Sequence, residues 1–424
     1  MMKQVQRLFS HMISPLVMIA GLMLATFGMA CQEAKDAPEP NDDERRMNTP
    51  HAATAQEQGH EDPGFSDDHV LFGQSAAFTG PARELGKAMR LGIEAAFHEA
   101  NQDGGVHGRV LKLKALDDGY ETDFAATNTQ RLIENESVFA LIGAVGTPTS
   151  RAAYPLAQDA GVPFLAPFTG AEFLRDPELN NVLNVRASYY QETDEMVARL
   201  TEDLGITRVA VLYQEDSFGL NGLEGARLAL ERRGLEPVAA SHYPRNTRAV
   251  RGAVFKITAA NPEAVILIGS YKPVVKTIEL VRRELNPVFM TVSFVGSNAL
   301  ANELGPEGAG VYVTQVVPLP HDENIPVVAR YQNALSGFDP QAEPGFVSLE
   351  GYLAGRFAVA GLKACGTDLS REGLLEAVRD AGVIEIDGMP LEYGPEDNQG
   401  SDAVFLTVIG TDGQYHGVEK LKRP

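Results

Sequence analysis

Three loops of the sequence combine hydroxyl side chains with glycine, and each lies between a short apolar run and an amphipathic stretch. The loops are residues 75–81, 143–150 and 166–171, and their threonines include Thr79, Thr147 and Thr169. Hydroxyls and free backbone N–H groups at the positive ends of helices suit a carboxylate or another acceptor-rich small molecule. Each threonine alone could be a helix cap, but three such loops at one sheet edge favour a shared binding site.

The motifs of common enzymes are incomplete in this sequence. Five residues rather than four separate Gly80 from Gly86, and Ala88 stands where a phosphate-binding loop needs a hydroxyl. The glycines of residues 219–225 are spaced three apart, so the dinucleotide-binding fingerprint is also missing. A His-Glu-x-x-His zinc motif and a Gly-x-Ser-x-Gly elbow are absent from the sequence. We therefore predict a protein that is not an enzyme and that uses no cofactor and no metal.

The charge balance argues against a nucleic-acid partner. The chain has 424 residues, with 36 basic and 57 acidic side chains and a formal net charge of −21. Phosphate binding needs a basic face, which this balance disfavours. The length and a hydrophobic content of 44% allow two or three domains with a core in each. Cys31 and Cys365 are the only cysteines, too few for a disulfide framework.

The first thirty residues have the pattern of an export signal. Two basic residues are followed by an uncharged, mainly apolar stretch that continues up to Glu33. The small residues before Cys31 resemble the cleavage site of a bacterial lipoprotein, with Gly28 where that family usually carries leucine. We expect residues 1–30 to be a signal peptide and Cys31 to receive a lipid; ordinary cleavage and an uncleaved membrane anchor are the alternatives. Residues 31–69 are polar without apolar periodicity, which predicts a disordered tether.

From Val70 onward, short apolar runs alternate with amphipathic stretches. The apolar runs predict strands at 70–73, 110–116, 138–143, 162–166, 209–213, 237–243, 264–269 and 294–296. The amphipathic stretches predict helices at 82–101, 122–136, 149–160, 190–204, 219–233, 247–260 and 273–285. Alternation of this kind implies an α/β fold with parallel sheets covered by helices on both faces.

The alternation breaks near residues 184 and 311, and the order of elements then changes. Helices are predicted at 325–336, 346–364 and 370–381, followed by strands at 390–394 and 402–410. We infer two α/β lobes, to both of which the C-terminal third contributes.

The domain resembles the periplasmic leucine-binding type of solute-binding protein, which serves branched-chain amino-acid ABC transporters. The resemblance runs from about residue 70 to the C-terminus and rests on residues 80–86 (Gly-Pro-Ala-Arg-Glu-Leu-Gly), 92–106, 116–118, 143–150 and 166–167. It implies two doubly wound parallel-sheet lobes joined by three crossovers, near residues 184–187, 312–316 and 388–393. Lobe one would then be 70–185 plus 316–388, and lobe two 186–315 plus 389–424.

The resemblance also implies ligand contacts. The matching positions are Thr147, Phe168, Thr169, Gly170, Phe218, Tyr271, Asn298 and Tyr352. Thr147 matches a hydroxyl ligand, residues 168–170 match a clamp on the amino-acid head group, and the aromatic residues match contacts in lobe two and near the hinge. Phe218 could instead be ordinary packing.

Asn298 departs from the family pattern, because amino-acid binders carry there an acid that pairs with the ligand ammonium. An amide supplies only a dipole, and an uncompensated buried charge is expensive. We expect weak binding of leucine, isoleucine and valine and a preference for a neutral or anionic solute, unless Glu350 supplies the missing carboxylate.

The sequence therefore predicts an exported, lipid-anchored protein that delivers a small polar solute, such as an amino-acid-like, amide or carboxylate compound, to an ABC permease. A location in the periplasm or at the cell surface follows from the signal. A membrane-linked ligand sensor, or a hydrolase on a similar two-lobe sheet, are the alternatives.

Overall fold

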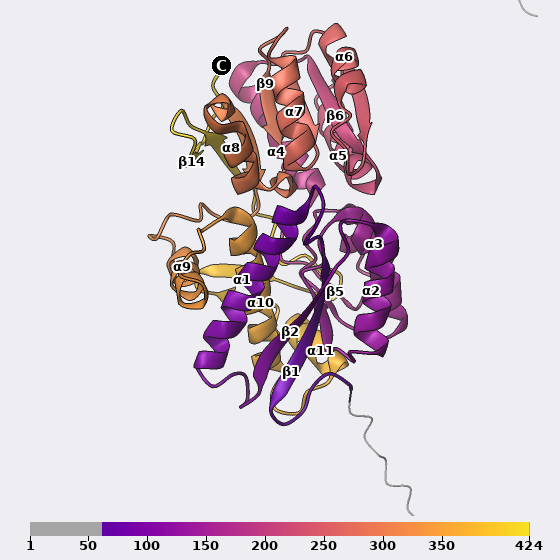
Figure 1. The fold of residues 1–424 in the computed structure, drawn as a ribbon, viewed down its shortest axis with the longest axis vertical. Coiled ribbons are helices and arrows are strands. Elements are labelled where there is room, and N and C mark those ends of the chain that lie inside the picture. The colour runs from indigo at the N-terminus through magenta and orange to yellow at the C-terminus, as the bar shows by residue number, and fades with distance from the viewer. Residues whose placement is uncertain (1–61, 424) are drawn as a thin grey trace, which may run out of the picture. The chain divides into compact units, whose positions relative to one another are not determined.

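The first lobe contains a five-stranded parallel sheet (Figure 1). A computed structural model describes residues 62–423, so the predicted signal peptide and Cys31 lie outside the described residues. The strands are β1 (His69–Ala76), β2 (Val110–Asp117), β3 (Ala140–Ile142), β4 (Phe164–Leu165) and β5 (Val182–Leu183), in the order β2-β1-β3-β4-β5. Strands β3, β4 and β5 are completely buried, which agrees with helices on both faces of a parallel sheet.

Six helices complete the first lobe, three from each end of the described chain. They are α1 (Arg83–Gln102), α2 (Thr122–Glu134), α3 (Thr147–Asp159), α9 (Pro326–Phe338), α10 (Phe346–Cys365) and α11 (Arg371–Ala381). Leu85, Met89 and Ile93 form the buried stripe of α1 at a spacing of four residues. A two-stranded antiparallel sheet of β11 (Val383–Ile386) and β12 (Met389–Glu392) follows α11.

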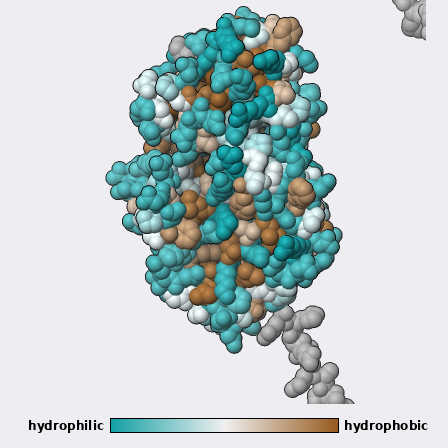
Figure 2. Space-filling view, in the orientation of Figure 1, coloured by the Kyte–Doolittle hydropathy of each residue, from teal (hydrophilic) through white to brown (hydrophobic). Residues whose placement is uncertain are grey.

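The second lobe contains a seven-stranded sheet in the order β14-β13-β10-β9-β8-β6-β7. Its parallel strands are β6 (Val209–Glu215), β7 (Ala239–Pro244), β8 (Ala264–Ile268), β9 (Val288–Thr291) and β10 (Val311–Gln315), while β13 (Phe405–Ile409) and β14 (Tyr415–Gly417) are antiparallel. The helices are α4 (Tyr189–Leu204), α5 (Ser217–Glu231), α6 (Arg251–Ala259), α7 (Tyr271–Val281) and α8 (Ser297–Leu304). The face shown in Figure 2 is mainly hydrophilic, with apolar residues in patches.

The α/β class and the two parallel-sheet lobes are confirmed, and three details are corrected. The predicted tether of residues 31–69 is too long, because residues 62–69 are ordered: Asp62 accepts a hydrogen bond from Arg371 N at 2.7 Å. The predicted strand 294–296 is instead a 3₁₀ turn, η3 (Ser293–Val295). The range 389–424, assigned to lobe two, includes β12, which pairs with β11 rather than with the seven-stranded sheet.

Close contact between α1 and α10 depends on glycines in both helices. A Cβ atom on Gly92 would lie 1.9 Å from the carbonyl oxygen of Ser348, and one on Gly351 would lie 2.3 Å from that of Met89. Real atoms do not approach so closely, so the two backbones can be this near only without side chains at these positions. This contact joins the first helix of lobe one to a helix supplied more than 240 residues later in the chain.

We predict that Gly92→Ala destabilises the protein by about 1–3 kcal/mol, because the added methyl group forces the two helices apart. Gly337→Ala is the matched control: Gly337 also lies in a helix, α9, but a Cβ there meets nothing within 4 Å. The free energy of unfolding of this control should rise by up to about 1 kcal/mol, because alanine has a higher helix propensity than glycine. Denaturant unfolding measures the two free energies, and an equal effect of the two substitutions would contradict the packing argument.

Candidate functional site

Hydroxyl groups from two loops of lobe one meet at the carboxyl end of its sheet. Thr147 begins α3 and Thr169 follows β4, and their Oγ1 atoms lie 2.7 Å apart. Thr169 also donates to the Tyr189 hydroxyl at 3.4 Å, and the Gly170 carbonyl accepts from Tyr189 N at 2.7 Å. The two threonines are fully buried. The structure thus brings Thr147, Thr169 and Gly170 together, as predicted from the loop pattern.

An aromatic cluster joins this hydroxyl group to lobe two. The Phe294 ring, from η3, lies 5.2 Å from the Phe168 ring and 4.8 Å from the Phe218 ring, between centroids. Tyr120 lies 6.1 Å from Phe294 and Tyr189 lies 5.3 Å from Phe218, and all five rings are buried. Phe168 and Phe218 were predicted from the sequence. Tyr120 and Phe294 were not predicted. Phe294 was instead interpreted as part of a strand.

Tyr271 and Asn298 line a cavity of about 370 Å³ between the lobes. Tyr271 begins α7 and Asn298 lies in the first turn of α8, while the opposite wall comes from the N-terminal half of α1, the first turn of α10 and the residues just before α10. The Asn298 Nδ2 atom donates to the carbonyl oxygen of Pro344 at 3.1 Å. These two predicted residues therefore lie between the lobes, next to the Phe294 turn.

Tyr352 does not join the other predicted residues. Its hydroxyl donates to Glu99 of α1 at 2.9 Å, and its ring packs 5.6 Å from Tyr331 of α9, so it belongs to the interior of lobe one. Glu350, two positions earlier on α10, points in another direction because successive residues of a helix are turned by about 100°. The structure therefore does not place Tyr352 beside the other predicted residues, and its contact with a ligand stays a prediction.

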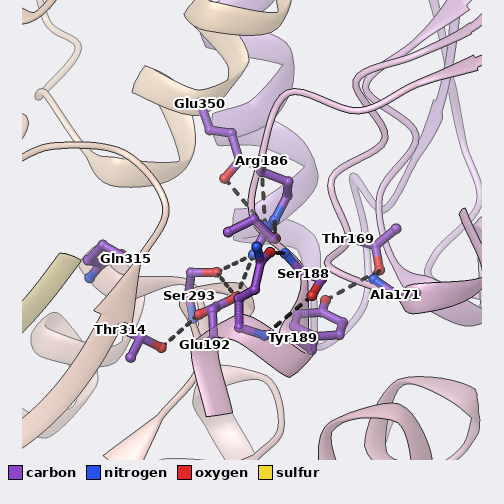
Figure 3. A network of polar contacts seen from close by, with 12 residues as sticks. Thr169, Ala171, Arg186, Ser188, Tyr189, Glu192, Ser293, Thr314, Gln315 and Glu350 are labelled. Atoms are coloured by element: carbon purple, nitrogen blue, oxygen red, sulfur yellow. Dashed lines mark hydrogen bonds and ion pairs between the residues drawn. The ribbon is translucent and has the colours of Figure 1, made fainter. Parts of the chain in front are cut away.

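A buried ionic network lies behind the aromatic cluster (Figure 3). Arg186, in the first crossover, donates to Glu192 of α4 at 2.8 Å and forms an ion pair with Glu350 of α10 at 3.3 Å. It also donates to the Ser293 hydroxyl, and Ser293 N donates to Glu192 at 2.8 Å. Thr314 donates to the same carboxylate at 2.7 Å. The network therefore joins the first crossover, lobe one and lobe two.

Sequence reasoning missed Arg186, although a signal was present. It is the one charged residue of segment 181–188, which contains an expected crossover, and such a residue needs a partner when the segment is buried. Glu350, considered as a carboxylate for a ligand ammonium, is paired with this arginine instead. Burial raises the pKa of Glu350 to about 7, with a further rise from the Glu192 charge and an opposing effect of Arg186.

A second set of contacts connects the lobes at the edge of the interface. Arg245, after β7, donates to the Tyr120 carbonyl at 3.0 Å and to the Glu121 carboxylate at 2.7 Å. Asn246 donates to the other oxygen of Glu121 at 2.6 Å. Residues 120–121 come from the β2–α2 loop of lobe one, so four hydrogen-bonding residues hold the two lobes together here.

Residues 62–423 offer neither a cluster of metal ligands nor a membrane-spanning helix. Within that part of the chain, no group of three or more His, Cys, Asp or Glu side chains is placed to hold a metal ion. None of the helices in the same range is both long enough and apolar enough to cross a membrane.

Two α/β lobes whose strand ends face each other across a buried interface, with three chain crossings between them, define the class of two-lobed binding proteins. Residues 70–414 match the family model described as periplasmic binding protein, and the chain belongs to this family. The chain is 39% identical to a possible leucine/isoleucine/valine-binding protein from Rhodopirellula baltica SH 1. That solved structure aligns with a TM-score of 0.80, covering 83% of this chain and 96% of the other.

Two further relatives have lower sequence identity to this chain. A substrate-binding periplasmic protein from Ralstonia solanacearum is 27% identical, with a TM-score of 0.77 and coverage of 82% of this chain and 100% of the other. Leu/Ile/Val-binding protein homolog 7 of Brucella abortus (strain 2308) is 27% identical over 206 residues, 46% of this chain. That match spans about half, 51%, of the Brucella protein.

We predict that Glu350→Gln changes the pH dependence of stability. The pKa of Glu350 is raised from its usual 4.5 to about 7, so the folded protein retains a proton that the unfolded chain releases. This stabilisation is complete below pH 4.5 and is lost as pH rises through 7, a difference on the order of 3 kcal/mol. Between pH 5 and pH 8, the unfolding temperature should decrease less for Glu350→Gln than for the wild type.

The exposed Glu202, on α4, provides the control for this measurement. Glu202→Gln should keep the pH dependence of the wild type. If the stability of Glu350→Gln depends on pH as that of the wild type does, the Glu350 carboxyl does not titrate between pH 5 and pH 8.

Proposed function

We propose that this protein captures a small polar, amino-acid-like solute between its lobes and delivers it to an ABC permease. The observation that carries the proposal is the meeting of buried hydroxyls and aromatic rings from opposite lobes at the carboxyl ends of the two sheets. No reaction is part of this function. The relative from Rhodopirellula baltica, described as a possible leucine/isoleucine/valine-binding protein, supports an amino-acid-like ligand.

The chemistry of the interface indicates how such a solute would be held. Thr147 and Thr169 offer hydroxyls, and the loops that carry them precede or adjoin the N-terminus of α3, where backbone N–H groups favour a carboxylate or amide oxygen. The Phe168, Phe218 and Phe294 rings would contact the apolar part of the solute. Tyr271 and Asn298 would complete the site from lobe two.

A permease would recognise the closed form of the protein. A ligand shifts the equilibrium between open and closed forms only by its differential affinity for them. The contacts of Arg245 and Asn246 with Glu121 exist only when the lobes approach, and so they add to the stability of the closed form.

We predict that Thr147→Ala weakens binding of the co-purified solute by about 1–3 kcal/mol, the cost of losing a hydrogen bond to a polar group in a buried site. Mass spectrometry of small molecules released from the purified protein identifies the solute, and titration calorimetry measures its affinity. Thr127→Ala is the control, because Thr127 lies on the exposed face of α2. Small-angle scattering should show compaction on binding. Wild-type affinity in Thr147→Ala together with no compaction would overturn the interlobe site.

Export and anchoring are part of the same proposal. The apolar segment before Cys31 and the polar residues after it support a lipoprotein that is held at the membrane of the periplasm or cell surface. Asp62, where the described residues begin, hydrogen-bonds to lobe one, so residues 31–61 would connect the lipid to that lobe.

We predict that Cys31→Ser moves the protein from the membrane fraction to the soluble exported fraction, because the residue that carries the lipid is lost. Fractionation followed by N-terminal mass analysis measures this. Cys365→Ser should leave the wild-type distribution unchanged. A membrane-bound Cys31→Ser protein with an intact N-terminus would show an uncleaved anchor instead.

A further inference from the structure

The cavity between the lobes has an acidic wall. It lies between α1 and α10 of lobe one and α7 and α8 of lobe two, and its lining includes Glu84, Glu303 and Glu343 against the single cation of Arg83. Arg83 donates to Glu84 at 2.8 Å, so this pair is neutral overall. Glu303 and Glu343, from lobe two and lobe one respectively, form neither a hydrogen bond nor an ion pair through their carboxylates with any residue in 62–423. Two carboxylates are therefore available to a ligand.

A buried tyrosine hydroxyl in the lining of the same cavity has no hydrogen-bond partner among residues 62–423. Tyr271 is 1% exposed, and its hydroxyl makes no hydrogen bond among the described residues. An unpaired buried polar group is destabilising, so a ligand atom that pairs with it is favoured. Asn298 also lines the cavity, and because its Nδ2 is engaged by Pro344, its Oδ1 is the atom that remains for a ligand.

Hydrogen-bond acceptors therefore outnumber donors among the side chains that line this partly apolar cavity. Two carboxylates, an amide oxygen and a tyrosine hydroxyl can all accept from N–H groups. Ala88, Leu91 and Val347 supply aliphatic surface on the lobe-one side of the cavity. This combination fits an aliphatic chain that ends in a group with several N–H donors.

We infer that this cavity binds a cationic nitrogen group, a primary ammonium or a guanidinium, which the solute carries on a short aliphatic chain. The inference rests on the proposed function, since it makes the cavity the outer part of the interlobe site. It revises the preference for a neutral or anionic solute that Asn298 alone suggested, because Glu303 and Glu343 line the same cavity as Asn298.

L-lysine and L-norleucine are the probes that test this inference, because they differ only in the ε-ammonium group. Calorimetric titration at low ionic strength should show that lysine binds about 3–10-fold more tightly, the preference expected from two solvent-accessible carboxylates. The preference should decrease with added salt. In the double variant Glu303→Gln/Glu343→Gln the affinity ratio should fall to about 1.

Glu307→Gln provides the matched control. Glu307 follows Glu303 by four residues and is also exposed, but it does not line this cavity, so the variant should keep the wild-type ratio. Tyr271→Phe should weaken lysine binding without lowering the unfolding temperature, because it removes a buried hydroxyl that has no partner in the protein.

The outcomes separate the cation site from the proposed function. Binding of lysine and norleucine with equal affinity, or a ratio that survives in the double variant, overturns the cation site while leaving solute binding in place. Failure of lysine to bind also overturns it, and the co-purified solute then decides the proposed function independently.

Discussion

The buried charge of Arg186 is the constraint on which the arrangement of the two lobes depends. Its side chain is completely inaccessible to water, and its guanidinium is held by Glu192 from one lobe and by Glu350 from the other. Removing a single partner of a buried ion pair typically costs 3–5 kcal/mol, because the remaining charge stays buried and unpaired. Arg186 of the first crossover therefore has to lie within reach of both α4 and α10. This requirement constrains how the two lobes pack against each other.

The same network positions the aromatic residues of the candidate site. The guanidinium of Arg186 lies 5.5 Å from the Phe168 ring centroid and 5.6 Å from that of Tyr189, where cation–π attraction is effective. Glu192 also binds Ser293 through the backbone and the side chain, and Ser293 immediately precedes Phe294. The turn that brings Phe294 between Phe168 and Phe218 is thus held by a polar contact behind it.

Polar contacts connect the segment between β12 and β13 to the first crossover. Asn184 N donates to the Asn398 carbonyl at 2.8 Å, and Gly400 N donates to the Asn184 carbonyl at 2.8 Å. Arg175 adds hydrogen bonds to Gln399 at 2.8 Å and to the Thr169 carbonyl at 3.1 Å. The segment of Gln399 and the threonine loop are therefore physically linked, since the Arg175 side chain binds both.

The sequence by itself determined the local features of this protein. Strand and helix periodicity predicted the α/β class, and the glycine and threonine pattern predicted that Thr147 and Thr169 meet at a sheet edge, because parallel strands place their carboxyl ends together. Periodicity and loop pattern depend on neighbouring residues, so they can be recognised in a single chain.

Only the tertiary structure decided which distant side chains face each other. Glu350 and Tyr352 lie two residues apart on α10, yet one binds Arg186 at the interface and the other binds Glu99 inside lobe one. Phe294 and Tyr120 meet because the two lobes approach each other, and Glu303 and Glu343 line one cavity for the same reason. These contacts join residues far apart in sequence, and their partners follow from how the lobes pack, a property that no local pattern contains.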